Sequence, residues 1–397
     1  MLYKKNKEKV LDKKLFENPT SEYRGTPFWA WNCELDKEDL LWQIEQLKEM
    51  GFGGFHMHSR DGMATNYLSD DFFDLIKACV DKAEKEDMLA YLYDEDRWPS
   101  GAAGGIVTKN KKYAQRNIRI SITKPKDVVS FEEAVEGGKT YFICACDVSL
   151  NEKGELLEYD VIYDVDAKEK NGSVRWYVTS FVTPPEGWFN NESYIDTLSK
   201  EAIDKFIETT HEAYKKEVGE KFGESVPSIF TDEPQFTRKG TLAFAESKDD
   251  IILPWTFDFD KTFKAKYGYS ILEKLPELFW DLPDGAASTA RYNYHDHVTD
   301  RFVAAFADNC GEWCEENGIK LTGHVMEEPT LGSQCGAVGE AMRAYRKFGI
   351  PGMDLLCDYR EFTTAKQVQS AVRQYGKEGM LSELYGVTNW DFDFRGH

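Results

Sequence analysis

The segment Ser228-Ile229-Phe230-Thr231-Asp232-Glu233-Pro234 ends an apolar run on two carboxylates, and a proline then turns the chain. A second segment, Met380-Leu381-Ser382-Glu383-Leu384-Tyr385-Gly386, has the same form, with a glycine as the turn residue. Each pattern predicts a short buried strand that carries a glutamate near its carboxyl end. Parallel βα barrels keep their chemistry at those strand ends. The two segments therefore predict both the fold class and the place of the site.

Strands and helices alternate on both sides of the first segment. Strands are predicted at residues 26–32, 53–58 and 88–94, with helices after Asp36 and Ser69. The apolar residues after Ser69 follow helical spacing. Three such units with short connections favour parallel strands covered by outer helices.

The alternation stops between residues 115 and 183. Four strands separated by polar turns are predicted there, at residues 117–123, 140–148, 156–164 and 174–183, with no helix. This pattern indicates an antiparallel insertion. The βα alternation then returns, with strands ending at Glu233 and at residues 319–325, 353–357 and 380–384.

Together these elements predict an α/β protein with a (β/α)8 TIM-barrel-like catalytic domain. We expect the chain to be a fragment that stops one βα unit short of eight, because an open seven-stranded sheet would expose unpaired edges. The predicted organisation is a first part of the barrel at residues 1–110, a β-rich insertion at 111–190, and the remainder of the barrel, incomplete at its carboxyl end, at 191–397.

Composition narrows the classes of partner. The formal net charge is −21, which disfavours nucleic acid because an acidic surface repels phosphates. No apolar run is long enough to span a membrane. Residues 1–14 lack the apolar core of a signal peptide, so a cytoplasmic location is expected.

Eight cysteines in 397 residues predict free buried thiols rather than a disulfide framework.

The two strand-end glutamates are the predicted catalytic pair. Cleavage of a glycosidic bond needs one carboxylic acid that protonates the leaving oxygen. A second carboxylate attacks the sugar or activates water. Glu233 and Glu383 belong to the fourth and seventh predicted strands, so their side chains can flank one sugar. The alternative is that Glu233 caps the next segment while Glu383 pairs with an arginine.

Several other strand ends carry acids, histidines or tryptophans. Such residues can bind sugar hydroxyls or stack on sugar rings, whereas one of them alone would be a weak signal. We predict a carbohydrate substrate, bound by Trp31, His58, Asp94, Glu95, Trp98, His324, Glu327, Glu328 and Trp390. Glu327 and Glu328 could equally be solvated loop acids.

A metal-dependent hydrolase is a second class of function. Alternation places His56 and His58 on one face of a strand, and His324 could supply a third ligand. No strand-end lysine is present to bridge two metals, and the sixth strand offers Asp354 and Asp358 but no histidine. These ligand types make the metal class the weaker one. A non-catalytic carbohydrate-binding protein is the third class.

Several segments together resemble glycoside hydrolase family 106, the α-L-rhamnosidase family. The resemblance spans most of the chain outside the β-rich insertion. The matching stretches are Pro27-Phe28-Trp29-Ala30-Trp31-Asn32, residues 46–58, Tyr67-Leu68-Ser69, Tyr93-Asp94-Glu95, residues 98–105, Phe230-Thr231-Asp232-Glu233-Pro234, Gly323-His324 and Ser382-Glu383-Leu384-Tyr385-Gly386.

The resemblance implies a (β/α)8 domain that hydrolyses rhamnose-containing glycans with inversion, near a calcium ion. It implies that Glu233 is the proton donor and that Glu383 is the base that activates water. Glu327 or Glu328 would be a further active-site acid. Family members are longer, with β-sandwich domains after the barrel. Asp-Glu-Pro after the fourth strand also resembles the retaining glycosidases that use strands four and seven, so a β-galactosidase-like exo-glycosidase is the alternative.

Overall fold

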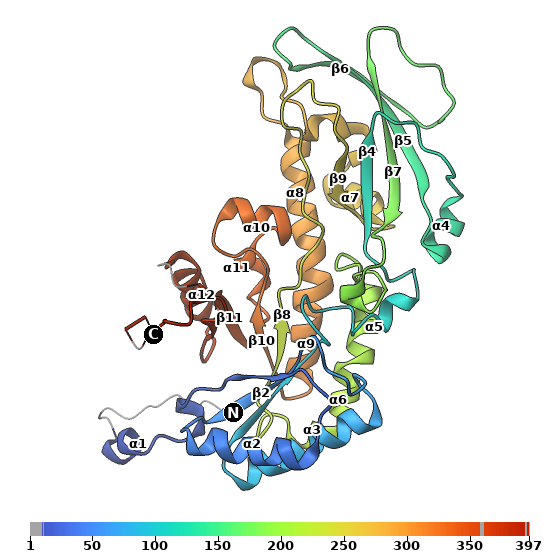
Figure 1. The fold of residues 1–397 in the computed structure, drawn as a ribbon. Coiled ribbons are helices and arrows are strands. Elements are labelled where there is room, and N and C mark those ends of the chain that lie inside the picture. Colours follow the sequence, from blue (N-terminus) through green and yellow to red (C-terminus); the bar gives the residue numbers. More distant parts are fainter. Residues whose placement is uncertain (1–9, 11, 358–360, 394, 397) are drawn as a thin grey trace.

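The computed structural model describes residues 10, 12–357, 361–393, 395 and 396 (Figure 1). Asp358, one of the acids considered above, lies outside these residues. Two sheets organise the fold. The first has seven parallel strands in the order β1-β2-β3-β8-β10-β11-β12. Its strands are β1 (Phe28–Trp31), β2 (Gly54–Ser59), β3 (Leu89–Tyr93), β8 (Ser228–Asp232), β10 (Lys320–His324), β11 (Ile350–Leu355) and β12 (Leu381–Leu384).

Helices connect and cover these strands. Helix α3 shows why they form: Ser69 caps its first turn by accepting a hydrogen bond from the Phe72 amide at 3.2 Å. Acidic residues occupy its first turn and lysines its last, which suits the helix dipole. The helices are α1 (Lys13–Glu17), α2 (Lys37–Glu49), α3 (Asp70–Lys85), α4 (Phe131–Gly137), α5 (Lys200–Thr209), α6 (His211–Val218), α7 (Phe259–Tyr267), α8 (Thr289–Phe302), α9 (Asn309–Glu316), α10 (Leu331–Ala337), α11 (Ala341–Ala344) and α12 (Thr363–Gln374).

Shorter helical turns complete the connections. A π-helical segment, Val303–Asp308, joins α8 to α9, so the helical run continues between them through a change of hydrogen-bond register. The 3₁₀ turns are Ser21–Tyr23, Val107–Lys109, Gly187–Phe189, Gly219–Lys221, Ile271–Leu278 and Pro283–Gly285. In the described part of the chain, no helix is both long and apolar enough to cross a membrane.

The register of the parallel sheet aligns the polar residues at the strand ends. Asp232 pairs with His324 across β8 and β10, and Asp354 pairs with Glu383 across β11 and β12. Paired residues of neighbouring strands share a face of the sheet. Gly323 is required just before this row, because a Cβ there would lie 1.8 Å from the Thr231 carbonyl oxygen. The sheet therefore brings four chemistry-bearing side chains to one face.

The predicted (β/α)8 TIM barrel is wrong for this structure. The parallel sheet is an open half-barrel in which β1 and β12 are the two edges. A groove of about 580 Å³ lies between these edges, lined by residues 24–28 on one side and residues 380–386 on the other. The sequence pattern counts strands correctly, but closure depends on the edges meeting, which no local signal encodes.

The second sheet is antiparallel and has five strands in the order β6-β5-β7-β4-β9. It stands apart from the half-barrel, beside α7 and α8 (Figure 1). Four of its strands lie within residues 115–183, and the expectation that this region has no helix is wrong, because α4 (Phe131–Gly137) lies there. The fifth strand comes from beyond the insertion. The strands are β4 (Arg116–Ser121), β5 (Tyr141–Leu150), β6 (Leu156–Ile162), β7 (Val174–Val182) and β9 (Ile251–Pro254).

Candidate active site

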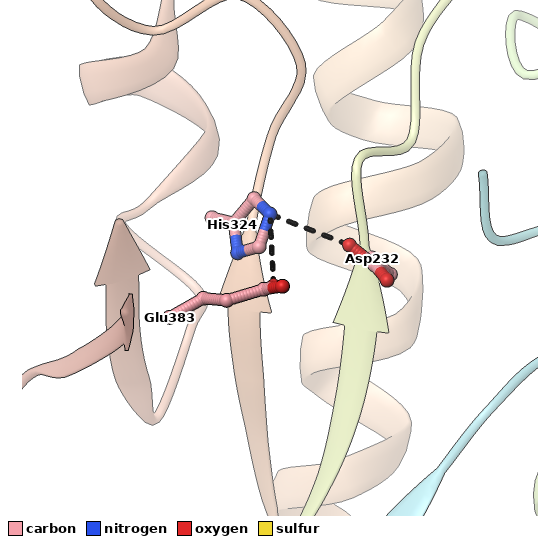
Figure 2. Close-up of side chains that lie close together, drawn as sticks. All are labelled: Asp232, His324 and Glu383. Carbon is pink, nitrogen blue, oxygen red and sulfur yellow. Dashed lines mark ion pairs between the residues drawn. The ribbon is translucent and has the colours of Figure 1, made fainter. Parts of the chain in front are cut away.

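Side chains from β8, β10, β11 and β12 form one cluster of charged groups. His324 of β10 lies at its centre (Figure 2). Its Nε2 atom is 3.3 Å from Oδ1 of Asp232, 3.8 Å from Oε2 of Glu383 and 3.9 Å from Oδ2 of Asp354. Three carboxylates around one imidazole make a compact group that can hold and exchange protons.

His324 is buried, and its charge state follows from its neighbours. Burial alone would lower the pKa of the imidazole. The ion pair with Asp232 and the negative charges of Glu328 and Glu383 outweigh burial and raise the pKa of His324 well above its ordinary value. The ring is therefore a cation at neutral pH, and it offsets part of the repulsion among the carboxylates.

Asp232 is the buried anion of the cluster. The Tyr93 hydroxyl donates to its Oδ2 at 2.7 Å, and Nε2 of His58 lies 3.9 Å from the same atom. The Asp232 amide donates to Oγ of Ser100 at 2.8 Å. Burial would raise the pKa of Asp232, but the interactions with His324 and His58 outweigh burial and hold this pKa below its ordinary value. Asp232 therefore stays ionised.

Glu233 follows β8 in an uncommon backbone conformation. Its φ is 48°, in the left-handed region that residues other than glycine rarely adopt. The Glu233 amide donates to the carbonyl of His324 at 3.2 Å, which holds this turn against β10. Such strain costs on the order of 1–3 kcal/mol and gathers at functional sites. The turn directs the next carboxylate after Asp232 toward the same cluster.

The Glu233 side chain reaches that cluster. Carboxylate oxygens of Glu233 and Asp354 and a ring nitrogen of His324 lie within 4.8 Å of one another. Burial, only partly opposed by the positive charge of His324, raises the pKa of Glu233 to about 7. A carboxyl group of this kind holds its proton close to neutral pH, as a general acid must.

Glu383 occupies the opposite end of the row, on β12. Atoms of Asp232, His324 and Glu383 also lie within 4.8 Å of one another. The Glu383 side chain is 20% exposed and lines the groove between the sheet edges. Burial and the charge of Asp232 raise the pKa of Glu383 to about 8. Both sequence-predicted catalytic glutamates thus lie around His324, from the fourth and seventh strands of the sheet.

Asp94 and Glu95 are buried at the carboxyl end of β3. Glu95 accepts hydrogen bonds from the amides of Asp96, Gly101, Ala103 and Gly104. Asp94 accepts a hydrogen bond from the Ser100 hydroxyl at 2.6 Å. These bonds fold residues 96–104 into a fixed loop, and Ser100 links the loop to Asp232. In this structure the two acids hold the backbone of this loop.

Glu327 and Glu328 follow β10 and have separate partners. Glu328 is buried; its Oε1 accepts from the Tyr345 hydroxyl at 2.5 Å and its Oε2 from the Asp354 amide at 3.1 Å. Burial raises the pKa of Glu328 to about 7. Glu327 is partly exposed and pairs with Arg238. Glu328 therefore positions Asp354, whereas Glu327 lies at the rim.

The remaining predicted substrate-binding residues occupy different surroundings. His58 lies beside the cluster and packs on the Tyr93 ring, with centroids 3.9 Å apart. Trp98 is half-buried against Trp188. Trp31 is buried on the helix-facing side of β1, against Phe72 of α3. Trp390 is fully exposed after β12. Of these four, His58 is the one with a contact to the cluster.

The donor atoms do not favour the implied metals. Among the described residues, the groups that could hold a cation are Asp232 with His324 and Glu383, and Glu233 with His324 and Asp354. Both need an imidazole nitrogen, whereas calcium prefers six to eight oxygen ligands. His56, which packs on the Tyr91 ring, belongs to neither group, so the predicted His56–His58–His324 metal triad does not come together.

Two members of the cluster were not among the predicted site residues. Asp232 directly precedes Glu233. Like His58 and His324, it is a polar residue at the carboxyl end of a buried strand, and this shared position is the signal that would have found it. Asp354 is the last polar residue of a weak strand pattern, and only its register with Glu383 shows that it faces inward.

Comparisons with known proteins are consistent with this architecture. No protein-family model matches the chain, and no curated protein does. A solved structure, that of a rhamnosidase from Novosphingobium sp. PP1Y, matches with a TM-score of 0.58 and 13% sequence identity. The match covers 93% of this chain and 52% of the other, so the chain spans about half of the length of that rhamnosidase. At this identity the likeness shows a shared fold, and the fold is one that a rhamnosidase uses.

Proposed function

We propose that this chain carries the catalytic machinery of a glycoside hydrolase, an inverting α-L-rhamnosidase in which Glu233 is the general acid and Glu383 the general base. The observation that carries the proposal is the placement of two glutamates with raised pKa values around one buried histidine. Glycosidic cleavage needs such a pair at one sugar. The rhamnosidase fold of the structural neighbour supports the reaction class, and the sequence resemblance supports the sugar and the roles.

A cavity next to the cluster supports a sugar substrate. It has a volume of about 370 Å³, and Asp354 lies in its wall. The other residues of its wall include Leu355, Phe362, Leu384, Tyr385 and Phe392. Carbohydrate sites pair such aromatic and aliphatic walls with a few polar groups. A 6-deoxy sugar such as rhamnose carries a methyl group that this apolar wall would accommodate.

The order of the two pKa values does not by itself assign the roles. Glu383, with a pKa of about 8, holds the single shared proton more readily than Glu233, with a pKa of about 7. For pKa values one unit apart, the form with the proton on Glu233 is about one tenth of the singly protonated enzyme. The assignment of Glu233 as the acid therefore rests on the resemblance, and substitution tests it.

The proposal is tested with a panel of 4-nitrophenyl glycosides. We expect the chain to release nitrophenol from the α-L-rhamnoside and not from the β-galactoside, and a Glu233→Gln/Glu383→Gln double variant to release none. Proton NMR of the first product should show the β-anomer, because inversion changes the configuration. An α-anomer product would favour the retaining alternative, and turnover equal to that of the double variant on every substrate would contradict the proposal.

The pH dependence of kcat/KM is expected to be bell-shaped. An acid–base pair is active when it holds one proton between its two members. Below about pH 7 both Glu233 and Glu383 are protonated, and above about pH 8 both are ionised. Activity should therefore be highest between these values and fall about tenfold per pH unit on either side. The two limbs belong to the coupled pair rather than to one residue. The charges that face the pair come from Asp232, His324, Asp354 and Glu328.

A His324→Asn variant is the control for this profile. The His324 cation lowers the pKa of both glutamates, so its removal should move both limbs to higher pH. A Glu38→Gln substitution on the exposed face of α2 should leave the profile in place. If both limbs of the His324 variant stay at the same pH as in the unsubstituted chain, the role given to the imidazolium is contradicted.

A further inference from the structure

Arg60 is a half-buried cation at the carboxyl end of β2. Its guanidinium carbon lies 4.5 Å from the ring centroid of Trp98, a stacking distance for a cation on an indole. Among the described residues, no carboxylate lies within ion-pair distance of Arg60, although the chain has 70 acidic and 49 basic residues. An unneutralised guanidinium held on an aromatic face is suited to bind an anion.

The neighbouring Arg97 also stacks on a tryptophan, but its charge is neutralised by carboxylates. Arg97 stacks on Trp188 with its guanidinium carbon 5.6 Å from the ring centroid. Its nitrogens lie 3.0 Å from Asp61 and 3.1 Å from Asp96. The two arginines thus share a setting but differ in their partners, and only the charge of Arg60 is left for a ligand from outside.

The corner formed by Trp98 and Trp188 is fixed. Their ring centroids are 4.7 Å apart with an interplanar angle of 77°, and the Trp188 indole N–H donates to the Trp98 carbonyl. Trp98 belongs to the loop that Glu95 holds through backbone amides. The aromatic surface under Arg60 is therefore preorganised.

The corner also adjoins the acid cluster. Arg60 is two residues after His58, whose imidazole contacts Asp232. Trp98 is two residues before Ser100, whose hydroxyl oxygen accepts the Asp232 amide at 2.8 Å. Short stretches of backbone therefore connect Arg60 and Trp98 to the residues that contact Asp232.

We propose that Arg60 and Trp98 form a subsite for a carboxylate-bearing sugar, a uronic acid unit of the glycan. The inference rests on the proposed function and names the substrate class for the same site. The guanidinium would bind the carboxylate through paired N–H donors, as arginine does with planar anions. The indole would face the sugar ring. The acidic surface elsewhere repels an anionic glycan, so a specific cation is needed where the anion docks.

Calorimetric titration with digalacturonic acid and with its carboxyl-reduced form tests the subsite. The titrations use the full chain, and neither ligand carries a rhamnoside bond that the proposed enzyme would cleave. The acid should bind at least about tenfold more tightly than the reduced sugar, the range expected for charge-assisted hydrogen bonds. Adding Arg60→Gln should remove this preference and leave the affinity for the reduced sugar unchanged. Arg60→Lys should restore only part of it, because lysine lacks the planar fork.

Arg97→Gln is the matched control. It removes the same positive charge from the same corner without removing the proposed contact. It should weaken acid binding less than threefold, because solvent and salt screen the general effect of one charge. Thermal unfolding checks that each variant is folded. Equal binding of the two sugars, or equal losses in the two glutamine variants, would overturn the subsite. A monosulfated disaccharide that binds as tightly as the uronate would overturn the choice of a carboxylate.

These outcomes are distinct from failure of the proposed function. Preference for the acid without hydrolysis of any glycoside would leave the subsite standing and remove the hydrolase. Hydrolysis of a neutral rhamnoside without any preference for the acid would do the opposite.

Discussion

Glu233→Gln is expected to lower kcat/KM on alkyl rhamnosides by about 10²–10⁴-fold, the range that general acid catalysis contributes. Glutamine has nearly the same shape but no proton to give to the departing oxygen. A 2,4-dinitrophenyl rhamnoside needs little such help, because its leaving group is already stable as an anion. Its rate should fall far less. The measurement is a series of aryl rhamnosides with leaving groups of graded pKa.

The slope of log kcat/KM against leaving-group pKa decides the role. It should be steep in the Glu233 variant and shallow in the unsubstituted chain. A steep slope in Glu383→Gln instead would exchange the two roles, which the higher pKa of Glu383 alone would favour. Equal losses on good and poor leaving groups in both variants would remove the acid role from either glutamate.

Glu383→Gln is expected to lower turnover on every rhamnoside by about 10²–10⁴-fold, because attack of water then lacks its base. The loss should not depend on the leaving group. Azide is small and needs no deprotonation, so it should restore turnover of the dinitrophenyl substrate and yield a rhamnosyl azide.

The Glu233 variant is the control for this rescue. Azide should restore little turnover of alkyl rhamnosides there, because the missing function is on the side of the leaving group. A Glu383 variant that keeps most of its activity would contradict the assignment. So would equal rescue of both variants by azide.

The positions of the strands could be predicted because their signals are local. The predicted strand at residues 53–58 is β2 (Gly54–Ser59), and the strand ending at Glu233 is β8 (Ser228–Asp232). Apolar runs bounded by turn residues carry this information within a few positions.

The cluster could be predicted only in part. Their positions at strand ends were enough to select Glu233, Glu383 and His324, and all three lie in the cluster. It also selected Glu95, whose carboxylate is occupied by backbone amides, and Trp31, whose ring packs against helix α3. The sequence places all of these at strand ends alike. It does not say which way a loop folds or which partner a buried carboxylate finds.

By itself, the sequence determined the alternation of strands and helices, the antiparallel insertion, and the choice of a glutamate on each side of the cluster, because periodicity and turn residues act over short separations. Only the tertiary structure decided that the parallel sheet stays open between β1 and β12 and that Asp232, His324, Asp354 and Glu383 meet. Closure and charge contacts depend on strand register and on burial across elements far apart in the chain, and these arise only when the whole sheet has assembled.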